Sequence, residues 1–260
     1  MPRLNPSMYW VGNIAKSRII SEILDAHPAT PITIFDYGCG DGGDWRRVLA
    51  DRPDIRMVGY EPDQTSAQRA RERLQGLQVE IHTGDAIQTL ELSADCIVTF
   101  SVFEHVVDRR AFLAHTKRLL APAGVLYLNY DDGHFRSLLD LVDVSTWGRA
   151  FRTMAQTLVS GPAAGRPAKY QRRVEARDAD RLVEEAGFRI GRVDYHNLLD
   201  LKELAKTLPP ELREDYARWW LAAERTLNDR FLVHLAVPRY GDTANLWTRM
   251  VTRTMLLRHA

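Results

Sequence analysis

The chain has 260 residues, of which 45% are hydrophobic and 27% are charged, so it can bury one large core. Its 35 basic and 34 acidic residues nearly cancel to a net charge of +1, which gives no overall field that would draw it to nucleic acid or to an anionic membrane. We find no signal peptide at the start and no apolar run of about 18 residues, so we expect a cytoplasmic protein without a membrane partner. Two cysteines, Cys39 and Cys96, are too few for a four-ligand zinc site or a disulfide framework.

The first half of the sequence alternates short apolar runs with helical patterns. Residues 14–26 carry isoleucines at helical spacing and predict an amphipathic helix, within an N-terminal cover of residues 1–30. The next predicted strands are residues 32–36, 55–60, 77–81, 95–100 and 125–130, and the predicted helices between them include 44–50, 64–74 and 109–120. Near-continuous apolar strands separated by helices indicate a parallel sheet covered on both faces.

Two insertions interrupt this alternation in the second half. The first predicted insertion spans residues 131–176, and a helix at 177–186, ended by Gly187, leads into a sixth strand at 188–195. The second, residues 197–229, has apolar and aromatic residues at helical spacing. We predict the apolar run FLVHLAV, residues 231–237, as the seventh strand. The main domain would then span 31–237, and residues 238–260 would be a C-terminal tail too short for a domain.

A glycine-rich loop, FDYGCGDGG at residues 35–43, lies between the first strand and the next helix. Gly38, Gly40 and Gly43 fit the spacing G-x-G-x-x-G. Glycines at such a turn let backbone N–H groups approach a ligand closely, at the amino end of a helix. The spacing alone favours a dinucleotide, so it leaves an NAD-dependent oxidoreductase open.

Two acidic residues follow the next two strands. Glu61 comes directly after the second strand, where a carboxylate can accept both hydroxyls of a ribose, and Pro62 turns the chain away. Asp85, in the segment TGDA after the third strand, can accept from an adenine amine while the Ala86 amide donates to the ring. Because these positions lie at successive strand ends, they describe one adenosine pocket together with the glycine loop.

In this order and spacing, the motifs DYGCGDG, VGYEP, TGDA, DCIVTFSVFEHV and LLAPAGVLYL resemble those of the class I S-adenosylmethionine (SAM)-dependent methyltransferases. The similarity covers residues 31–131 well and 177–237 more loosely. It implies an α/β, Rossmann-like fold whose seven-stranded sheet has the order 3-2-1-4-5-7-6, with the seventh strand antiparallel and with helical lid insertions.

The resemblance also implies SAM as the cofactor. Gly38 and Gly40 would approach its methionine portion, Asp36 or its neighbours its amino group, Glu61 the ribose and Asp85 the adenine. Residues 100–105 would line the cofactor. The predicted cofactor-binding residues are Asp36, Tyr37, Gly38, Cys39, Gly40, Glu61, Pro62, Asp85, Ala86, Ser101, Phe103 and His105.

Two alternatives stay open at this point. An NAD-dependent oxidoreductase shares the glycine spacing and an acidic residue near position 61, but gives no role to TGDA or FEHV. A non-catalytic scaffold or partner subunit of the same fold would carry the pocket without forming a methylated product.

We expect the methyl acceptor to be a small molecule. The chain has neither the Asn/Asp-Pro-Pro-aromatic motif of enzymes that methylate amino groups of DNA bases nor the Pro-Cys pair of cytosine-carbon enzymes, so no nucleic-acid substrate is expected. Asp131 and Asp132 could supply half of a metal site, but Ser101 does not supply the other half, and no metal is predicted.

The insertions flank the carboxyl edge of the sheet, where open α/β folds bind ligands. Their aromatic residues are candidates for substrate binding, although most could pack the core of a lid: Tyr9, Trp10, Trp147 and Tyr170. The prediction is methyl transfer to an oxygen or nitrogen atom of a small molecule, with specialised metabolites as the class considered, by a monomer or homodimer.

His134, just beyond the fifth strand, is the leading candidate for a general base, because imidazole titrates near neutrality and this loop faces the expected methyl position. A surface loop histidine is the alternative interpretation. Tyr130, Asp131 and His105 are further catalytic candidates, with His105 inside the segment expected to form the cofactor wall.

Overall fold

The structure is a computed structural model that describes residues 13–28, 30–131, 174, 176–232 and 250–260. Within these residues the chain forms a seven-stranded sheet in the order β3-β2-β1-β4-β5-β7-β6. The strands are β1 (Ile32–Tyr37), β2 (Ile55–Tyr60), β3 (Val79–His82), β4 (Ala94–Phe100), β5 (Leu120–Asp131), β6 (Phe188–Leu198) and β7 (Met250–His259). β7 pairs antiparallel with both β5 and β6, and the pairs among β1 to β5 are parallel. The predicted strand order and orientation are therefore confirmed.

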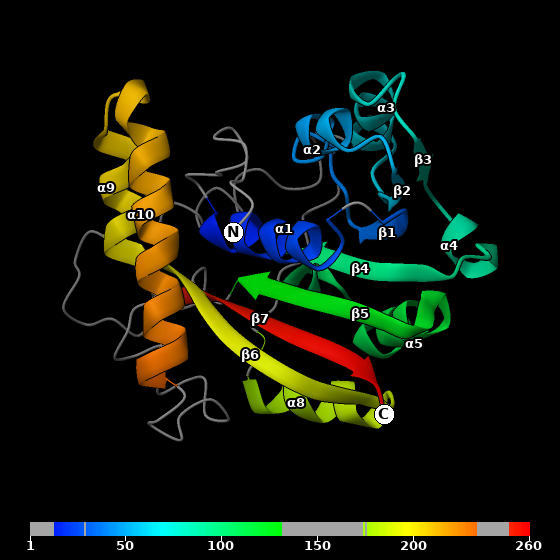
Figure 1. The fold of residues 1–260 in the computed structure, drawn as a ribbon. Coiled ribbons are helices and arrows are strands. Elements are labelled where there is room, and N and C mark those ends of the chain that lie inside the picture. Colours follow the sequence, from blue (N-terminus) through cyan, green and yellow to red (C-terminus); the bar gives the residue numbers. More distant parts are fainter. Residues whose placement is uncertain (1–12, 29, 132–173, 175, 233–249) are drawn as a thin grey trace, which may run out of the picture.

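Helices cover both faces of the sheet (Figure 1). They are α1 (Ile14–Ala26), α2 (Arg46–Asp51), α3 (Gln64–Arg73), α4 (Ala86–Thr89), α5 (Arg109–Leu119), α8 (Ala176–Glu185), α9 (Leu199–Thr207) and α10 (Arg213–Thr226). Short 3₁₀ turns, η2 (Phe103–His105) and η4 (Pro210–Leu212), and a π-helical turn, η5 (Leu227–Leu232), complete the described elements.

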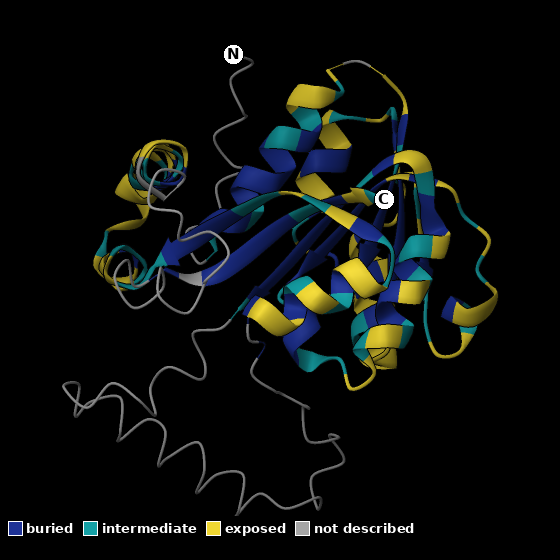
Figure 2. Ribbon diagram, turned by 90° about the horizontal axis from the view of Figure 1, so that it is seen from below, coloured by how far each residue is buried: buried dark blue, intermediate teal, exposed yellow. Residues whose placement is uncertain are grey.

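The core has two layers, one on each face of the sheet. One layer joins α1 and α2 to the strands, for example through Ile19, Trp45 and Met57. The other joins α5 and α8 through Phe112, Val183 and their neighbours. The central strands β1, β2 and β4 are almost entirely buried, while the helices keep an exposed outer side (Figure 2). This burial on both faces explains why the strands appear in the sequence as continuous apolar runs.

Local signals set several of the helix ends. The Asp63 side chain accepts a hydrogen bond from the Ser66 N–H and caps α3, and Asp108 caps α5 in the same way through the Ala111 N–H. Gly187 follows α8 with a φ of 79°, a left-handed conformation that glycine adopts without strain. The predicted helix end at Gly187 is confirmed.

The position predicted for the seventh strand was wrong. The strand is β7, Met250–His259, within the segment that we interpreted as a C-terminal tail. Phe231 and Leu232 instead end the π-helical turn η5, and residues 233–237 lie outside the described residues. A short apolar run has no periodicity that separates a strand from a helix, which is why this run was misleading.

The second predicted insertion forms a pair of helices beside the end of β6. Figure 1 shows α9 and α10 standing together at the edge of the sheet where β6 ends. Trp220 of α10 is fully buried and packs with Ala217 and Ile14, so it belongs to a small core shared by α10, α9 and α1. Trp219 is 56% exposed and lies on the outer side.

Candidate functional site

The glycine loop lies at the carboxyl end of β1, where its backbone is held by β2. The N–H groups of Gly38 and Cys39 both donate to the Tyr60 carbonyl, at 2.7 and 3.1 Å. Gly38 and Gly40 have φ values of 90° and 57°, which a residue with a side chain adopts only with strain. A Cβ placed on Gly40 would meet no atom within 4 Å, so the loop leaves open space at this position. The loop therefore has room for a ligand to approach its backbone.

Asp36 is the one acidic residue of β1 and is buried. One of its two carboxylate oxygens forms a hydrogen bond within the protein. Its Oδ2 accepts a 2.6 Å hydrogen bond from Trp45 Nε1, while Oδ1 has no hydrogen-bond partner in the structure as described. Burial raises the pKa of Asp36 to about 7, against the opposite effect of the Trp45 N–H. A buried acceptor without a partner is costly, and a cationic ligand group would satisfy it. The ammonium group of SAM fits this requirement.

Glu61 connects the end of β2 to the glycine loop. Its Oε2 accepts from the Gly40 N–H at 2.9 Å, and its Oε1 accepts from the Asp63 N–H at 3.0 Å. The two contacts fix the carboxylate at the sheet edge, and each oxygen keeps further acceptor capacity for a hydroxyl group. Pro62, next in the chain, is exposed.

Asp85 and Ala86 lie beyond β3, in the next loop along the same edge. Asp85 is exposed and precedes the short helix α4, which starts at Ala86. Its side chain makes no capping hydrogen bond to that helix. The structure thus brings Gly40, Glu61 and Asp85 to successive strand ends, as the spacing predicted, and the contact of Asp85 with adenine stays a prediction.

The side chains of Tyr37 and Cys39 are buried. The Tyr37 ring packs against Phe112 with a centroid distance of 4.4 Å and edge-on against Tyr60 at 5.2 Å. Cys39 is 8% exposed, and burial raises the pKa of its thiol. These two residues can reach a cofactor only through their backbone.

The turn after β4 forms the other side of the glycine loop. A Cβ placed on Gly38 would lie 2.5 Å from a methyl group of Val102, so the two segments are in direct contact. Ser101 has a φ of 55°, and Phe103 is fully buried. His105 is half-buried, with its Nε2 3.9 Å from the Glu104 carboxylate. The predicted cofactor wall is therefore adjacent to the glycine loop.

The end of β5 supplies Tyr130 and Asp131. Tyr130 is 1% exposed, accepts a 3.0 Å hydrogen bond from Arg253 of β7, and has its pKa raised by burial. These contacts favour a structural role for its hydroxyl. Asp131 is half-buried, and its backbone N–H donates to Glu104 Oε1 at 3.2 Å, which places it beside the turn after β4.

Several predicted residues lie outside the described residues. They are the candidate base His134 and the candidate substrate-binding residues Tyr9, Trp10, Trp147 and Tyr170. Their roles stay predictions.

Trp45 was not predicted as a site residue, and Glu104 was predicted only as part of the cofactor-lining segment 100–105. Trp45 holds Asp36, and Glu104 holds the end of β5. Glu104 lies in the FEHV motif and is completely buried. The motif alone does not distinguish a buried carboxylate from one exposed to solvent.

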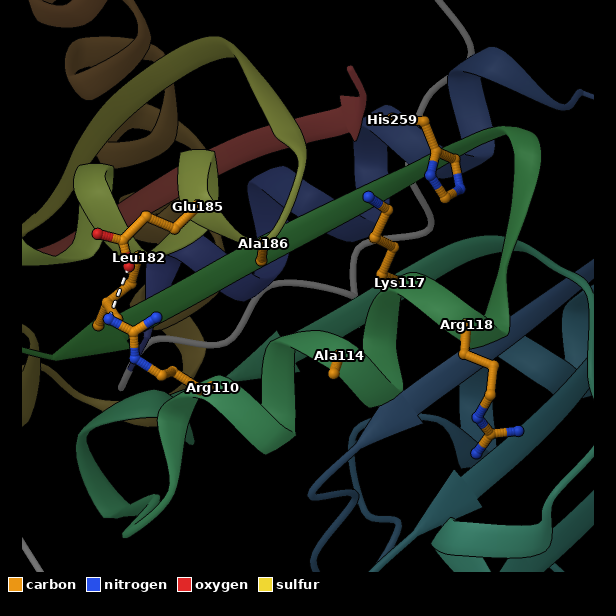
Figure 3. Close-up of a pocket in the computed structure, with 8 residues that line it drawn as sticks. All are labelled: Arg110, Ala114, Lys117, Arg118, Leu182, Glu185, Ala186 and His259. Carbon is orange, nitrogen blue, oxygen red and sulfur yellow. Dashed lines mark ion pairs between the residues drawn. The ribbon is translucent and has the colours of Figure 1, made fainter.

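A separate pocket lies away from this edge, in a groove between α5 and α8 (Figure 3). It has a volume of about 490 Å³, and four of its eight lining residues are basic: Arg110, Lys117, Arg118 and His259. Arg110 forms an ion pair with Glu185 across the groove at 2.7 Å. Arg118 donates to the carbonyls of Ile87 and Leu90, so both arginines have structural partners.

In the described part of the chain, no group of three or more His, Cys, Asp or Glu side chains is arranged to hold a metal ion. None of the helices in those residues has both the length and the apolar character needed to cross a bilayer.

This chain is similar in sequence to known methyltransferases. A family model described as "Methyltransferase domain" matches residues 13–193. A trans-aconitate 2-methyltransferase of Methylobacterium radiotolerans is 30% identical over 129 residues, which are 49% of this chain and 49% of that protein. A ubiquinone biosynthesis O-methyltransferase of Caulobacter vibrioides is 30% identical over 112 residues, 39% of this chain and 41% of that protein. The chain spans about half the length of the curated relatives it matches first.

Among solved structures, the cyclopropane synthase MmaA2 from Mycobacterium tuberculosis aligns with a TM-score of 0.56, over 94% of this chain and 84% of that chain. At 20% sequence identity, this similarity shows a shared fold.

Proposed function

Because the chain belongs to the class I SAM-dependent methyltransferase family, we propose that it transfers the methyl group of SAM to an oxygen atom of a small-molecule acceptor. The observation that carries the proposal is the set of groups at the carboxyl edge of the sheet. Gly40 leaves open space, Asp36 offers an unused carboxylate oxygen, and Glu61 is fixed beside Gly40. When bound, SAM supplies a methyl group already activated by its positive sulfur.

Each group in this set would hold a different part of SAM. Asp36 Oδ1 would accept from the ammonium group, and the Glu61 carboxylate from the ribose hydroxyls. Asp85 and the Ala86 N–H would meet the adenine. This assignment needs no metal ion and uses only acceptors and donors that the chain already presents at one edge.

Oxygen is favoured as the acceptor atom by relatives whose names specify O-methyl transfer, such as the ubiquinone biosynthesis O-methyltransferase. An acceptor hydroxyl must give up a proton as it takes the methyl group. Asp131 lies beside the turn after β4 and His105 lies in it, and with His134 they are the candidates to receive that proton. Alignment of the acceptor contributes more than the base, because good orientation alone can supply up to about 7–11 kcal/mol.

The proposal is tested with SAM that carries a deuterated methyl group, incubated with separate panels of carboxylic acids, phenols and amines. Mass spectrometry of the products should show the labelled methyl group on an oxygen atom. A labelled amine would correct the acceptor atom. Calorimetric binding of SAM without product from any panel would favour the non-catalytic scaffold, and absence of SAM binding would refute the proposal.

A further inference from the structure

Ser101 has a strained backbone at the point where β4 enters the turn that lines the cofactor. Its φ of 55° lies in the left-handed region, which costs free energy for any residue with a side chain. Among the described residues, Asn197 is the one other non-glycine residue with a positive φ. Since Val102 packs directly on Gly38, a change of conformation at Ser101 would move the wall against the glycine loop. Some other contact must hold Ser101 in place.

Asn129 of β5 provides this contact. Its side chain is fully buried, and its Oδ1 accepts a 3.2 Å hydrogen bond from the Ser101 N–H. Because a backbone N–H can only donate, this bond fixes which atom of the amide faces Ser101. The other amide atom, Nδ2, donates to Thr254 Oγ1 of β7 at 2.8 Å. The Asn129 amide is thus held between the end of β4 and β7.

Glu104 makes the reverse contact from the turn to the strand. Its side chain is fully buried, and its Oε1 accepts from the Asp131 N–H at 3.2 Å. β5 therefore holds the turn through Asn129, and the turn holds the end of β5 through Glu104. We call these two side-chain-to-backbone contacts the clasp.

We propose that the clasp fixes the turn from Ser101 to His105 in the conformation that binds SAM, so that Asn129 and Glu104 are positioning residues of the cofactor site. A buried polar side chain in a central strand costs free energy unless it is hydrogen-bonded, and an apolar residue would pack the strand equally well. The hydrogen bond with Ser101 gives Asn129 a role that an apolar side chain packed at this position could not have. The inference rests on the proposed function, because it takes this edge as the SAM site.

The test measures how strongly Asn129→Ala weakens binding of S-adenosylhomocysteine, by calorimetry, in three backgrounds. With Ser101 present, we expect the dissociation constant to rise about tenfold. In a Ser101→Ala background, which keeps the strain and removes only the hydroxyl, Asn129→Ala should again raise the dissociation constant about tenfold. In a Ser101→Gly background Asn129→Ala should raise it less than threefold, because glycine adopts the left-handed conformation without strain. An equal factor in all three backgrounds, or no effect of Asn129→Ala, would overturn the inference.

Thr254→Val is the second variant, for use if Asn129→Ala does not fold. It removes the oxygen that accepts from Asn129 Nδ2 and nearly keeps the shape of the side chain, so the Asn129 amide loses one of its two anchors and the dissociation constant should rise at least threefold. An unchanged dissociation constant would count against the clasp.

Hydrogen exchange of the amides of residues 101–106 in the ligand-free protein separates this inference from the proposed function. Asn129→Ala should accelerate exchange in this turn, and unchanged exchange would contradict the clasp. If the unmodified protein fails to bind S-adenosylhomocysteine, the proposed function fails, while the exchange experiment still tests whether the clasp holds the turn.

Discussion

Asp36 is expected to make SAM binding depend on pH. Burial raises the pKa of this carboxyl group to about 7, so it is largely protonated at pH 6 and largely ionised at pH 8. Only the ionised form offers a full negative charge to the ammonium group of SAM. The affinity, measured by calorimetry, should therefore be about tenfold weaker at pH 6 than at pH 8, in proportion to the ionised fraction.

Asp36→Asn is the control for this prediction. The variant should bind SAM weakly and without the change between pH 6 and pH 8, and a pH profile like that of the original protein would assign the titration to another group. A raised pKa also means that the folded state holds its proton more tightly than the unfolded state. Ionisation therefore destabilises the fold as pH rises from the ordinary value near 3.8 through about 7. Asp36→Asn should accordingly have a higher Tm than the original at pH 8.

Gly40→Val is expected to abolish SAM binding. The position has a left-handed φ of 57° and open space beyond its Cα, so a branched side chain would add strain and fill the space expected for the methionine part of SAM. We expect at least about a hundredfold loss of affinity, roughly 2.7 kcal/mol. Gly76→Val is the matched control, since Gly76 also has a positive φ and open space but lies in the turn before β3. Similar losses of affinity in both variants would mean that strain, and not the filled space, is responsible.

His134→Ala tests the leading base candidate. If His134 receives the acceptor proton, kcat should fall by about 10²–10⁴-fold while the SAM dissociation constant changes little. Steady-state kinetics and calorimetry on the same preparation measure the two effects. An unchanged kcat would remove His134 from the mechanism and leave Asp131 and His105 to be tested in turn.

The sequence was sufficient to predict which candidate residues meet at one edge of the sheet, but not to predict the contacts among them. The spacing of the motifs located Gly40, Glu61 and Asp85 at neighbouring strand ends, because parallel strands bring their carboxyl ends to one edge. The hydrogen bonds from Trp45 to Asp36 and from the Gly40 N–H to Glu61 were not predictable. They depend on side-chain packing across segments whose distance in space the sequence does not reveal.

At the scale of elements, Glu224 is expected to hold α10 on the end of β6. Its carboxylate is fully buried and accepts hydrogen bonds from the Asn197 and Leu198 N–H groups, at 3.2 and 2.8 Å, and from Trp220 Nε1 at 2.6 Å. His196 Nδ1 lies 3.2 Å from the same carboxylate. Glu224→Ala would leave these groups buried without their acceptor, so unfolding in denaturant should show a loss of roughly 3–5 kcal/mol.

Glu214→Ala, on the same helix, is the control for Glu224→Ala. Glu214 forms an exposed ion pair with Arg218 at 2.7 Å, and such pairs contribute little to stability. We expect a change of less than about 1 kcal/mol. A similar small change for Glu224→Ala would show that α10 does not depend on the buried carboxylate.

β7, the strand whose position was predicted wrongly, shows why some strands cannot be recognised from the sequence. β7 contains two threonines and two arginines among its ten residues, so it resembles a polar tail more than a central strand. Arg253 is nevertheless 1% exposed, because it donates to Tyr130 and pairs with Asp180 of α8 at 2.8 Å. A buried arginine is tolerated only with such partners. Since those partners lie far away in the sequence, the pattern of residues 250–259 alone did not indicate burial.

At the scale of the whole molecule, β7 joins two parts of the sheet that do not otherwise pair. It lies between β5 and β6, with residues 252–257 paired to β5 and residues 250–259 paired to β6. Both core layers also depend on it, because Met255 and Leu257 belong to the layer formed with α5 and α8, and Leu256 packs against the other layer. A chain ending at residue 249 would leave the inner edges of β5 and β6 unpaired and remove the partners of Tyr130 and Asp180.

We therefore expect the chain that ends at residue 249 to lose cooperative folding, because exposed strand edges and a divided core favour aggregation over a stable sheet. Denaturant unfolding followed by circular dichroism should show no single transition. A chain ending at His259, which keeps all of β7, should unfold like the original. A cooperative transition in the shorter chain would mean that β1 to β5 with their helices form a stable unit, and that β6 and β7 are added to a sheet that folds without them.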